Sequence, residues 1–170
     1  MTDDGIDYRD VVAMEEDEID AFLDEHQSGV LSLSREDEPY GFPVCYAHDP
    51  DEDVIYVIFG MHPGSKKVAY VEDNHRASLA VYDRSPGAKV RSAIASGSFH
   101  RVEDEERRET ARELLLSNHC TAPLYFWGVD SAQLDFEYYR LDIEEKTGRD
   151  SEISWPSPVR EKIVSMLEDD

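Results

Sequence analysis

Two adjacent lysines in the middle of the chain are the residues best placed to do chemistry. They occur in Gly64-Ser65-Lys66-Lys67, which follows an apolar, strand-like run and opens a segment with helical spacing. The first turn of a helix carries unpaired backbone N–H groups and positive dipole charge, so it favours acidic side chains. Lysines at this position, in a chain with 39 acidic residues, indicate that a bound anion supplies the negative charge.

Each residue of this loop suits a phosphate in a different way. Gly64 permits close approach of the backbone, and Ser65 offers a hydroxyl and also caps the helix. Lys66 and Lys67 bring two ammonium groups to a dianion. The loop therefore predicts a phosphate site, and the alternative is an ordinary turn followed by two solvated lysines.

Short strands with helices between them must position this loop. Strands are predicted over 30–34, 40–47, 54–59, 77–82, 91–102 and 136–143, from apolar alternation bounded by turn residues. Helices are predicted over 15–26 and 65–73, after the cap Asp104, and over 158–168, with a loop over 118–135. This pattern favours a closed antiparallel barrel with helices on its outside.

Length and composition fit one soluble globular domain. The 170 residues are 40% hydrophobic and 33% charged, too apolar for a disordered chain and too interrupted by charge for a membrane span. We expect a single domain over 1–170, with its core over about 15–148 and a C-terminal tail with a short helix over 149–170.

The acidic excess is the most unusual bulk property. The chain has 39 acidic and 17 basic residues, a net charge of -22, and its acids are spread from Asp3 to Asp170. Molar salt shortens the Debye length to about 3 Å and relieves such self-repulsion, so we expect a halophilic host. An acidic interaction surface is the alternative. A nucleic-acid partner is excluded because the chain offers no basic face.

Other common sites are not indicated by the sequence. Met1 leads into acidic residues without an apolar run, so we expect a cytoplasmic protein with no membrane partner. Neither Cys45 nor Cys120 belongs to a paired-cysteine metal spacing. The six histidines include no pair at the i, i+4 spacing of a helical zinc site, so no metal is expected. The glycine fingerprint of a Rossmann nicotinamide enzyme is also missing.

A family resemblance joins these pieces. From about Glu15 to Gly148 the chain resembles the pyridoxamine 5′-phosphate oxidase-like, FMN-binding split β-barrel family, in its small nitroreductase-like or unassigned branch. The matching pieces are, in order, the segments 16–23, 29–33, 39–44, 64–67, 77–82, 95–97, 139–143 and 147–148. The resemblance implies a mainly β (α+β) fold, a six-stranded antiparallel split β-barrel with peripheral helices. It also implies a homodimer with FMN at the subunit interface.

The resemblance further implies positions around the flavin. The strand against the isoalloxazine edge carries Pro43, Val44, Cys45 and Tyr46, and the phosphate lies at Gly64, Ser65, Lys66 and Lys67. Val81 and Tyr82 lie close by on the next strand, Ser92 reaches the cofactor from the partner subunit, and Phe126 or Trp127 covers the ring. Ordinary barrel packing is the alternative for Tyr46, Val81 and Tyr82.

The function implied is that of an FMN-dependent oxidoreductase, which passes a hydride or electrons to a small acceptor. The alternative is a non-catalytic module that binds or senses flavin, haem or a deazaflavin on the same fold. No catalytic side chain is assigned. The strand 138–143 and the acidic tail differ from the basic C-terminal signature of true pyridoxamine-phosphate oxidases, so their substrate is not expected here.

Overall fold

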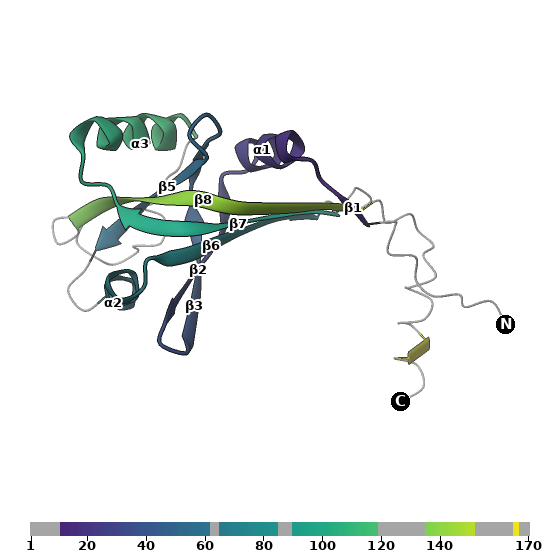
Figure 1. Ribbon diagram of the computed structural model, residues 1–170, viewed down its shortest axis with the longest axis horizontal. Coiled ribbons are helices and arrows are strands. Elements are labelled where there is room, and N and C mark those ends of the chain that lie inside the picture. The colour runs from purple at the N-terminus through teal and green to yellow at the C-terminus, as the bar shows by residue number, and fades with distance from the viewer. Residues whose placement is uncertain (1–10, 62–64, 85–89, 119–134, 152–164, 167–170) are drawn as a thin grey trace.

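One antiparallel sheet of eight strands forms the body of the protein (Figure 1). The computed structural model describes residues 11–61, 65–84, 90–118, 135–151 and 165–166. In chain order the elements are β1 (Val11–Ala13), α1 (Glu16–Glu25), β2 (Ser28–Arg35), β3 (Glu38–Cys45), β4 (Ala47–Asp49), β5 (Val54–Met61), α2 (Lys66–Asp73), β6 (Arg76–Arg84), β7 (Val90–Arg101), α3 (Glu105–Ser117) and β8 (Asp135–Ser151).

The strand order confirms the predicted fold class and corrects its details. The strands pair in the order β3-β2-β6-β7-β8-β5-β4, and β1 pairs with β8. Among the described strands β3 and β4 end this path, so the closed barrel expected from the strand pattern is wrong and the barrel is split. The sheet has eight strands where six were predicted, because the short strands β1 and β4 also pair.

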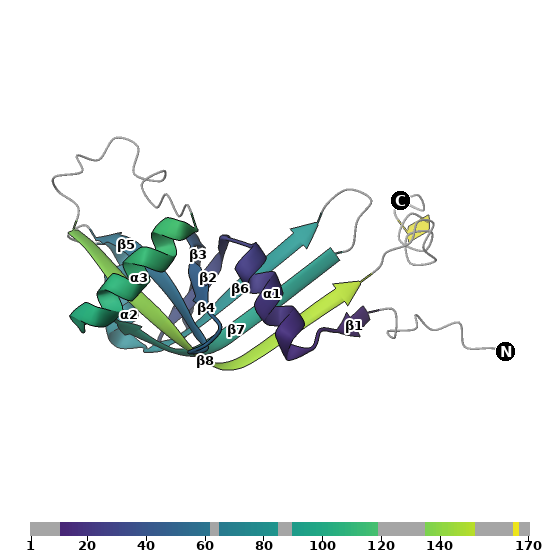
Figure 2. The ribbon, with the colours of Figure 1, turned by 90° about the horizontal axis from the view of Figure 1, so that it is seen from above.

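Strand β8 is the longest strand and joins the two halves of the sheet. Its first half pairs with β5, its second half pairs with β7, and its last residues pair with β1. The predicted strand over 136–143 is therefore too short. Glu144, Glu145 and Lys146 interrupt the apolar alternation in the sequence, yet they stay in the strand and Glu145 and Lys146 pair with β7. Figure 2 shows β6, β7 and β8 side by side with α1 across them.

A bulge at Gly97 lets β7 follow the curve of β8. The register between these strands shifts between Ser96 and Gly97. A Cβ atom at Gly97 would lie 1.9 Å from the backbone oxygen of Asp142, which is far inside van der Waals contact. Only glycine permits this approach, and the bulge increases the bend and twist that close the sheet around its core.

The core fills the interior of the curved sheet. Its fully buried large side chains include Phe22 and Leu23 of α1, Tyr46 between β3 and β4, and strand residues, among them Leu31, Leu79, Phe99 and Leu141. A smaller cluster lies under α3, where Ala111 and Leu115 pack at i, i+4 spacing. Both helices therefore form as predicted, each with one apolar face turned to the sheet.

The three described helices begin differently. The Glu15 N–H donates to the Glu18 carboxylate (2.8 Å) at the start of α1, and Asp104 accepts from the Arg107 N–H (3.0 Å) at the start of α3. Both helices have acids in the first turn. Ser65 holds the N-cap position of α2, but its hydroxyl makes no capping bond, contrary to the prediction, and the first turn contains no acid. The first turn of α2 thus has no acid of its own to balance its positive charge.

The β2–β3 hairpin brings an acidic turn close to α2. Arg35 pairs with Glu38, so Glu36 and Asp37 form a two-residue turn, in which Glu36 has a left-handed φ of 51°. The turn places three consecutive acids, 36–38, at the tip of the hairpin.

The predicted loop over 118–135 and the predicted helix over 158–168 lie almost entirely outside the described residues. The prediction of a single domain stays a prediction.

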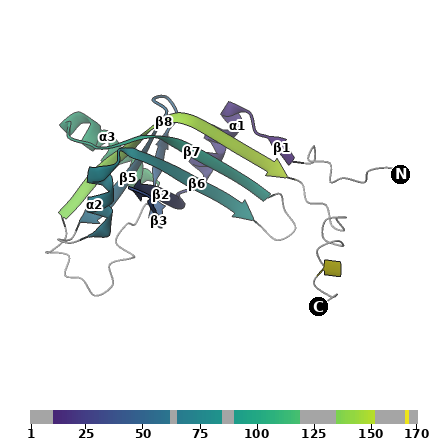
Figure 3. The ribbon, with the colours of Figure 1, turned by 60° about the horizontal axis from the view of Figure 1, so that its bottom comes forward.

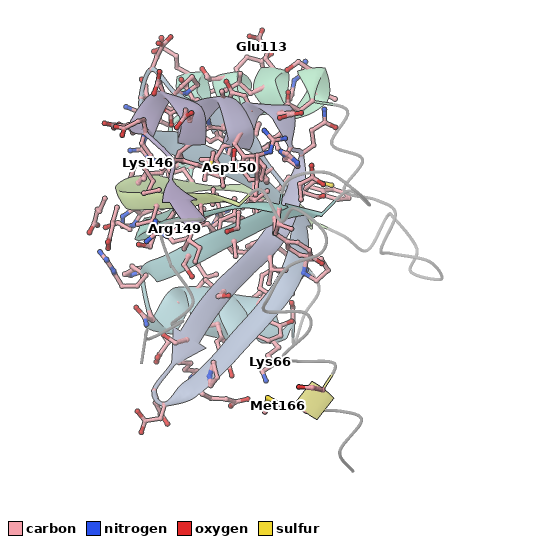
Figure 4. All side chains as sticks on the ribbon, turned by 90° about the vertical axis from the view of Figure 1, so that its right-hand side faces the viewer. Lys66, Glu113, Lys146, Arg149, Asp150 and Met166 are labelled. Atoms are coloured by element: carbon pink, nitrogen blue, oxygen red, sulfur yellow. The ribbon has the colours of Figure 1, made fainter. Side chains whose placement is uncertain are left out.

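A buried lysine ties α1 to the sheet. Lys146 of β8 lies 2.7 Å from Asp20 and 2.7 Å from Asp53, and 3.3 Å from Glu16 (Figure 4). Its side chain is only 9% exposed. These contacts raise the pKa of Lys146, despite its burial, so the lysine remains charged. The cluster joins α1, β8 and the turn before β5.

We expect Lys146→Met to lower the free energy of unfolding by about 2 kcal/mol, because it leaves the charges of Asp20 and Asp53 without their cation. Urea denaturation of both proteins at pH 7 measures the change. Arg112→Met is the control, since the exposed Arg112–Glu109 pair (3.5 Å) should contribute less than about 0.5 kcal/mol. Equal losses in the two variants would show that the Lys146 cluster is not a structural anchor.

Candidate functional site

Lys66 points toward the β2–β3 hairpin. Its ammonium lies 2.7 Å from the Glu38 carboxylate and 5.0 Å and 5.2 Å from the ring centroids of Tyr40 and Tyr70. Figure 4 shows the labelled Lys66 beside the tip of this hairpin. The side chain is half exposed, so the cation is held by three groups and still reached by solvent.

Lys67 points into the barrel instead. Its ammonium lies 4.8 Å from the centroid of the Phe42 ring and 5.4 Å from that of Phe59. Phe42 is on β3 and Phe59 on β5, two strands that do not pair with each other, so Lys67 spans the split in the barrel. No carboxylate of the described residues forms an ion pair with this ammonium, and burial lowers the pKa of Lys67. Among the described side chains, Lys67 is therefore a cation without a charged partner.

Helix α2 borders two hollows. One, of about 640 Å³, lies beside Lys66 and is lined by 35–39, Lys66, Ala69 and Tyr70. The other, a groove of about 830 Å³, includes Ser65, Val68, His75, His100 and Tyr139 among its lining residues. Ser65 and Lys66 are neighbours in the chain but face different hollows.

The hollow beside Lys66 contains charges of both signs. Its hydrogen bond to Glu38 raises the pKa of Lys66, and the same bond lowers the pKa of Glu38, with smaller contributions from the Tyr70 hydroxyl and Arg35. Both groups are therefore ionised at neutral pH. Arg35 itself lies 3.8 Å from Asp73 of α2. An anion that enters this hollow meets cations that already have carboxylate neighbours.

The predicted ring-edge strand divides its side chains between two faces. Val44 and Tyr46 are buried, and the Tyr46 hydroxyl donates to the Leu23 carbonyl (2.8 Å) inside the core. Burial raises the pKa of Tyr46, so the phenol stays protonated. Pro43 is exposed and Cys45 is half-buried on the opposite face. Of these four residues, only Pro43 and Cys45 turn their side chains away from the core.

Sheet register brings several predicted residues onto that outer face. Pro43 is opposite Val30, Val30 is opposite Ala80, and Ala80 is opposite Ile94. Tyr82 is opposite Ser92 on the same face. Val30, Tyr82 and Ile94 are 40%, 73% and 50% exposed, and none of the helices α1, α2 and α3 covers this face of β6 and β7 in Figure 3. We call the residues Val30, Pro43, Cys45, Ala80, Tyr82, Ser92 and Ile94 the outer face.

The remaining predicted residues lie elsewhere. Val81 is 1% exposed and faces the core, which agrees with the alternative that it is an ordinary packing residue of the barrel. Gly64, Phe126 and Trp127 are outside the described residues. The assignment of all eleven residues to a flavin site stays a prediction.

Sequence reasoning missed the immediate neighbours of the lysines. Glu38 contacts Lys66 although 28 positions separate them, and Tyr40 and Tyr70 supply the rings beside its ammonium. The polar residues 35–38 between two predicted strands are typical of a turn, but a turn does not reveal which helix it will lie against. The exposed Ile94 was equally hidden, since strand alternation does not tell which of the two faces stays uncovered.

Comparison with known proteins identifies the family. The family model described as pyridoxamine 5′-phosphate oxidase matches residues 15–150, which include every element from α1 almost to the end of β8. The chain belongs to the pyridoxamine 5′-phosphate oxidase family. The predicted resemblance is thereby confirmed. No curated protein sequence matches the chain.

Solved structures of similar proteins from other organisms share the fold. An FAD-binding protein from Mesorhizobium loti is 23% identical, with 84% of this chain and 99% of that chain covered and a TM-score of 0.67. A Corynebacterium glutamicum protein described provisionally as a pyridoxamine 5′-phosphate oxidase is 22% identical, with 85% and 95% covered and a TM-score of 0.66. An FAD- and haem-binding protein from Mycobacterium smegmatis is 18% identical, with 90% and 79% covered and a TM-score of 0.62.

The described residues contain neither a membrane-spanning helix nor a cluster of metal-ligating side chains. None of their helices is long and apolar enough to cross a membrane. In the same residues no three His, Cys, Asp or Glu side chains gather closely enough to hold a metal ion. The described regions that could hold a ligand include the lysines of α2, the two hollows beside it and the outer face.

The pH dependence of stability should report the burial of Lys67. Unfolding returns this lysine to water, where its pKa is near 10.5, so the unfolded chain binds the proton more tightly and Lys67 destabilises the fold at pH 7. That penalty disappears as pH rises from the lowered folded pKa toward 10.5. We therefore expect the stability advantage of Lys67→Met over the parent chain to shrink between pH 7 and pH 10.5, measured by urea denaturation.

Lys66→Met is the matched control for this titration. Glu38 raises the pKa of Lys66, so its contribution to stability persists through the same pH range and is lost only above it. If the difference in the free energy of unfolding between Lys67→Met and the parent chain does not change with pH, the burial of the Lys67 ammonium is contradicted.

Proposed function

We propose that the protein is an FMN-binding flavoprotein that acts as an FMN-dependent oxidoreductase. The observation that carries this proposal is the start of α2, which has two lysines and no acid in its first turn. Family membership and the flavin-binding descriptions of several similar structures support it. The phosphate would be held by Gly64, Ser65, Lys66 and Lys67.

A bound phosphate explains the charges around α2 better than the stability of the protein without a ligand does. The half-buried Lys67 ammonium has an aromatic surface on two sides and lacks an ion-pair partner in the described part of the chain. Unpartnered cations in such surroundings are costly, and a phosphate dianion would compensate this one. Since α2 begins with unbonded N–H groups as well, the same anion would satisfy backbone and side-chain donors together.

The outer face would receive the flavin ring. On β3 the side chains of Pro43 and Cys45 point away from the core. On β6 Tyr82 presents a largely exposed aromatic ring. A flavin bound along these residues would supply hydride or electron transfer to a small acceptor, while the protein orients it and excludes water. Val44, Tyr46 and Val81 would support the site from the core side, and the catalytic groups remain unassigned.

We also propose that the outer face pairs with a second copy of the chain. It carries three exposed apolar side chains, Val30, Tyr82 and Ile94, with the small Ala80 and Ser92 between them. An exposed apolar patch of this kind is typical of a protein–protein interface. In the homodimer FMN would lie at the subunit interface, with Ser92 contributed by the partner.

A cofactor-binding module without turnover is the second candidate. One similar structure binds both FAD and haem, and the rings of His75 and His100, with centroids 5.7 Å apart, line the groove of about 830 Å³. Either histidine would be a suitable axial ligand for haem. The carboxylates of Glu72, Glu103 and Glu137 on the same groove would repel haem propionates, which places this candidate second. The absorbance spectrum of the freshly purified protein distinguishes a flavin from a haem.

The phosphate assignment can be tested with the double variant Lys66→Ala/Lys67→Ala. Each charge-assisted contact contributes about 1.5–3 kcal/mol, so we expect FMN affinity to fall about 100-fold or more. Fluorescence titration with FMN and with riboflavin, in molar KCl, measures both affinities. Riboflavin lacks the phosphate and serves as the control, so its affinity should not change. Unaltered FMN binding in the double variant would refute the role of the lysines.

The dimer can be tested with Ile94→Glu. A charge at the centre of the outer face should convert the dimer to a monomer and weaken FMN binding, because part of the cofactor site would be lost. Size-exclusion chromatography with light scattering gives the mass. Leu116→Glu is the control, since Leu116 is 66% exposed but lies on α3, away from this face. A parent chain that is monomeric with FMN bound would overturn the proposed interface.

A further inference from the structure

Lys66 already has an anion beside it. The Glu38 carboxylate lies 2.7 Å from its ammonium, and the rings of Tyr40 and Tyr70 occupy two further sides. The hollow of about 640 Å³ borders the same lysine and the same carboxylate. Any phosphate that reaches Lys66 through this hollow must therefore compete with Glu38.

Glu38 cannot move far from the lysine. It is the first residue of β3 and pairs with Arg35 across the two-residue turn, so its backbone is fixed by the hairpin. A displaced carboxylate stays within one side-chain length of Lys66. Glu36 and Asp37, the two residues of the turn, line the same hollow and add negative charge.

The local charge balance makes the valence of the ligand decisive. Arg35 and Lys66 bring two positive charges to the hollow, whereas Glu36, Asp37 and Glu38 bring three negative ones. Arg35 is further engaged by Asp73 at 3.8 Å. A singly charged group gains no Coulomb energy by replacing a carboxylate of equal charge, and it is repelled by the one it displaces. A doubly charged group gains about twice the attraction to the lysine.

We propose that Glu38 is a specificity-determining residue, which makes the Lys66 site selective for a terminal phosphate monoester over phosphates in a pyrophosphate link. A monoester such as that of FMN carries close to two charges at neutral pH, whereas each phosphate of FAD carries one. This inference rests on the proposed function of the same site. The Glu38 carboxylate would favour FMN over FAD because it repels a singly charged phosphate that cannot displace it from Lys66.

The test compares FMN, FAD and riboflavin in the parent chain and in Glu38→Gln, by fluorescence titration at pH 7.5. Glutamine keeps the shape of the side chain and removes its charge. We expect the ratio of the FAD to the FMN dissociation constant to exceed 10 in the parent chain and to fall at least threefold in the variant. Riboflavin affinity should stay the same. Glu36→Gln is the control for the general charge of the hollow: it removes one negative charge from the same turn without a contact to Lys66 in the described structure, so it should change the ratio less than Glu38→Gln does.

A pH series gives a second measurement. The phosphate of a monoester loses its second charge with a pKa near 6, so parent affinity for FMN should fall severalfold from pH 7.5 to pH 5.5. Glu38 remains ionised in this range because Lys66 lowers its pKa. In Glu38→Gln, with the competing carboxylate neutral, the decrease should be smaller. Circular dichroism of both proteins checks that the hairpin variant is folded.

The outcomes separate this inference from the proposed function. A parent chain that binds FMN, with an FAD-to-FMN ratio that Glu38→Gln does not change, overturns the role of Glu38 alone. Tighter parent binding of FAD than of FMN overturns it as well. A parent chain that binds none of the three flavins overturns the proposed function, and the inference with it.

Discussion

The pairing of β8 with three other strands is the constraint on which this structure depends. One half of β8 holds β5, the other half holds β7, and β1 joins at its end. The strand can serve both halves of the sheet only because β7 bends at Gly97, where the backbone oxygen of Asp142 comes too close for any side chain. Lys146 then fixes α1 onto the same strand through its partly buried ion pair with Asp20. The split barrel follows from these local features.

The split in turn determines what the two lysines can do. Although β3 and β5 do not pair, the rings of Phe42 and Phe59 meet between them, with centroids 5.7 Å apart, and the Lys67 ammonium lies over both rings. One residue earlier, Lys66 faces the hairpin and its carboxylates. Successive positions on a helix differ by about 100° in direction, so adjacent lysines reach different surroundings. A phosphate bound between them would draw one cation out of an ion pair and neutralise the other.

Local signals in the sequence predicted the helices and most of the strands. Contacts between residues distant in the chain determine the length of β8 and the neighbours of Lys66. The cap Asp104 and the acidic first turn before Phe22 are local, so α3 and α1 could be predicted from the sequence. The length of β8 could not, because its second half depends on pairing with β7 and on the contacts of Lys146 with Asp20 and Asp53, all of which are distant in the chain. The sequence likewise indicated a phosphate at Lys66 without revealing Glu38, since hairpin and helix meet only in the folded protein.

The net charge of -22 acts on this site mainly at long range. At 0.1 M salt the Debye length is about 10 Å, so many distant acids repel an approaching phosphate, whereas at 1 M it is about 3 Å and only contacting charges are felt. The Lys66–Glu38 distance of 2.7 Å is within even the shorter length. High salt therefore removes the general repulsion and leaves the competition at Lys66 in place. An acidic chain of this kind would bind an anionic cofactor best in concentrated salt, with its selectivity determined by the few charges in direct contact.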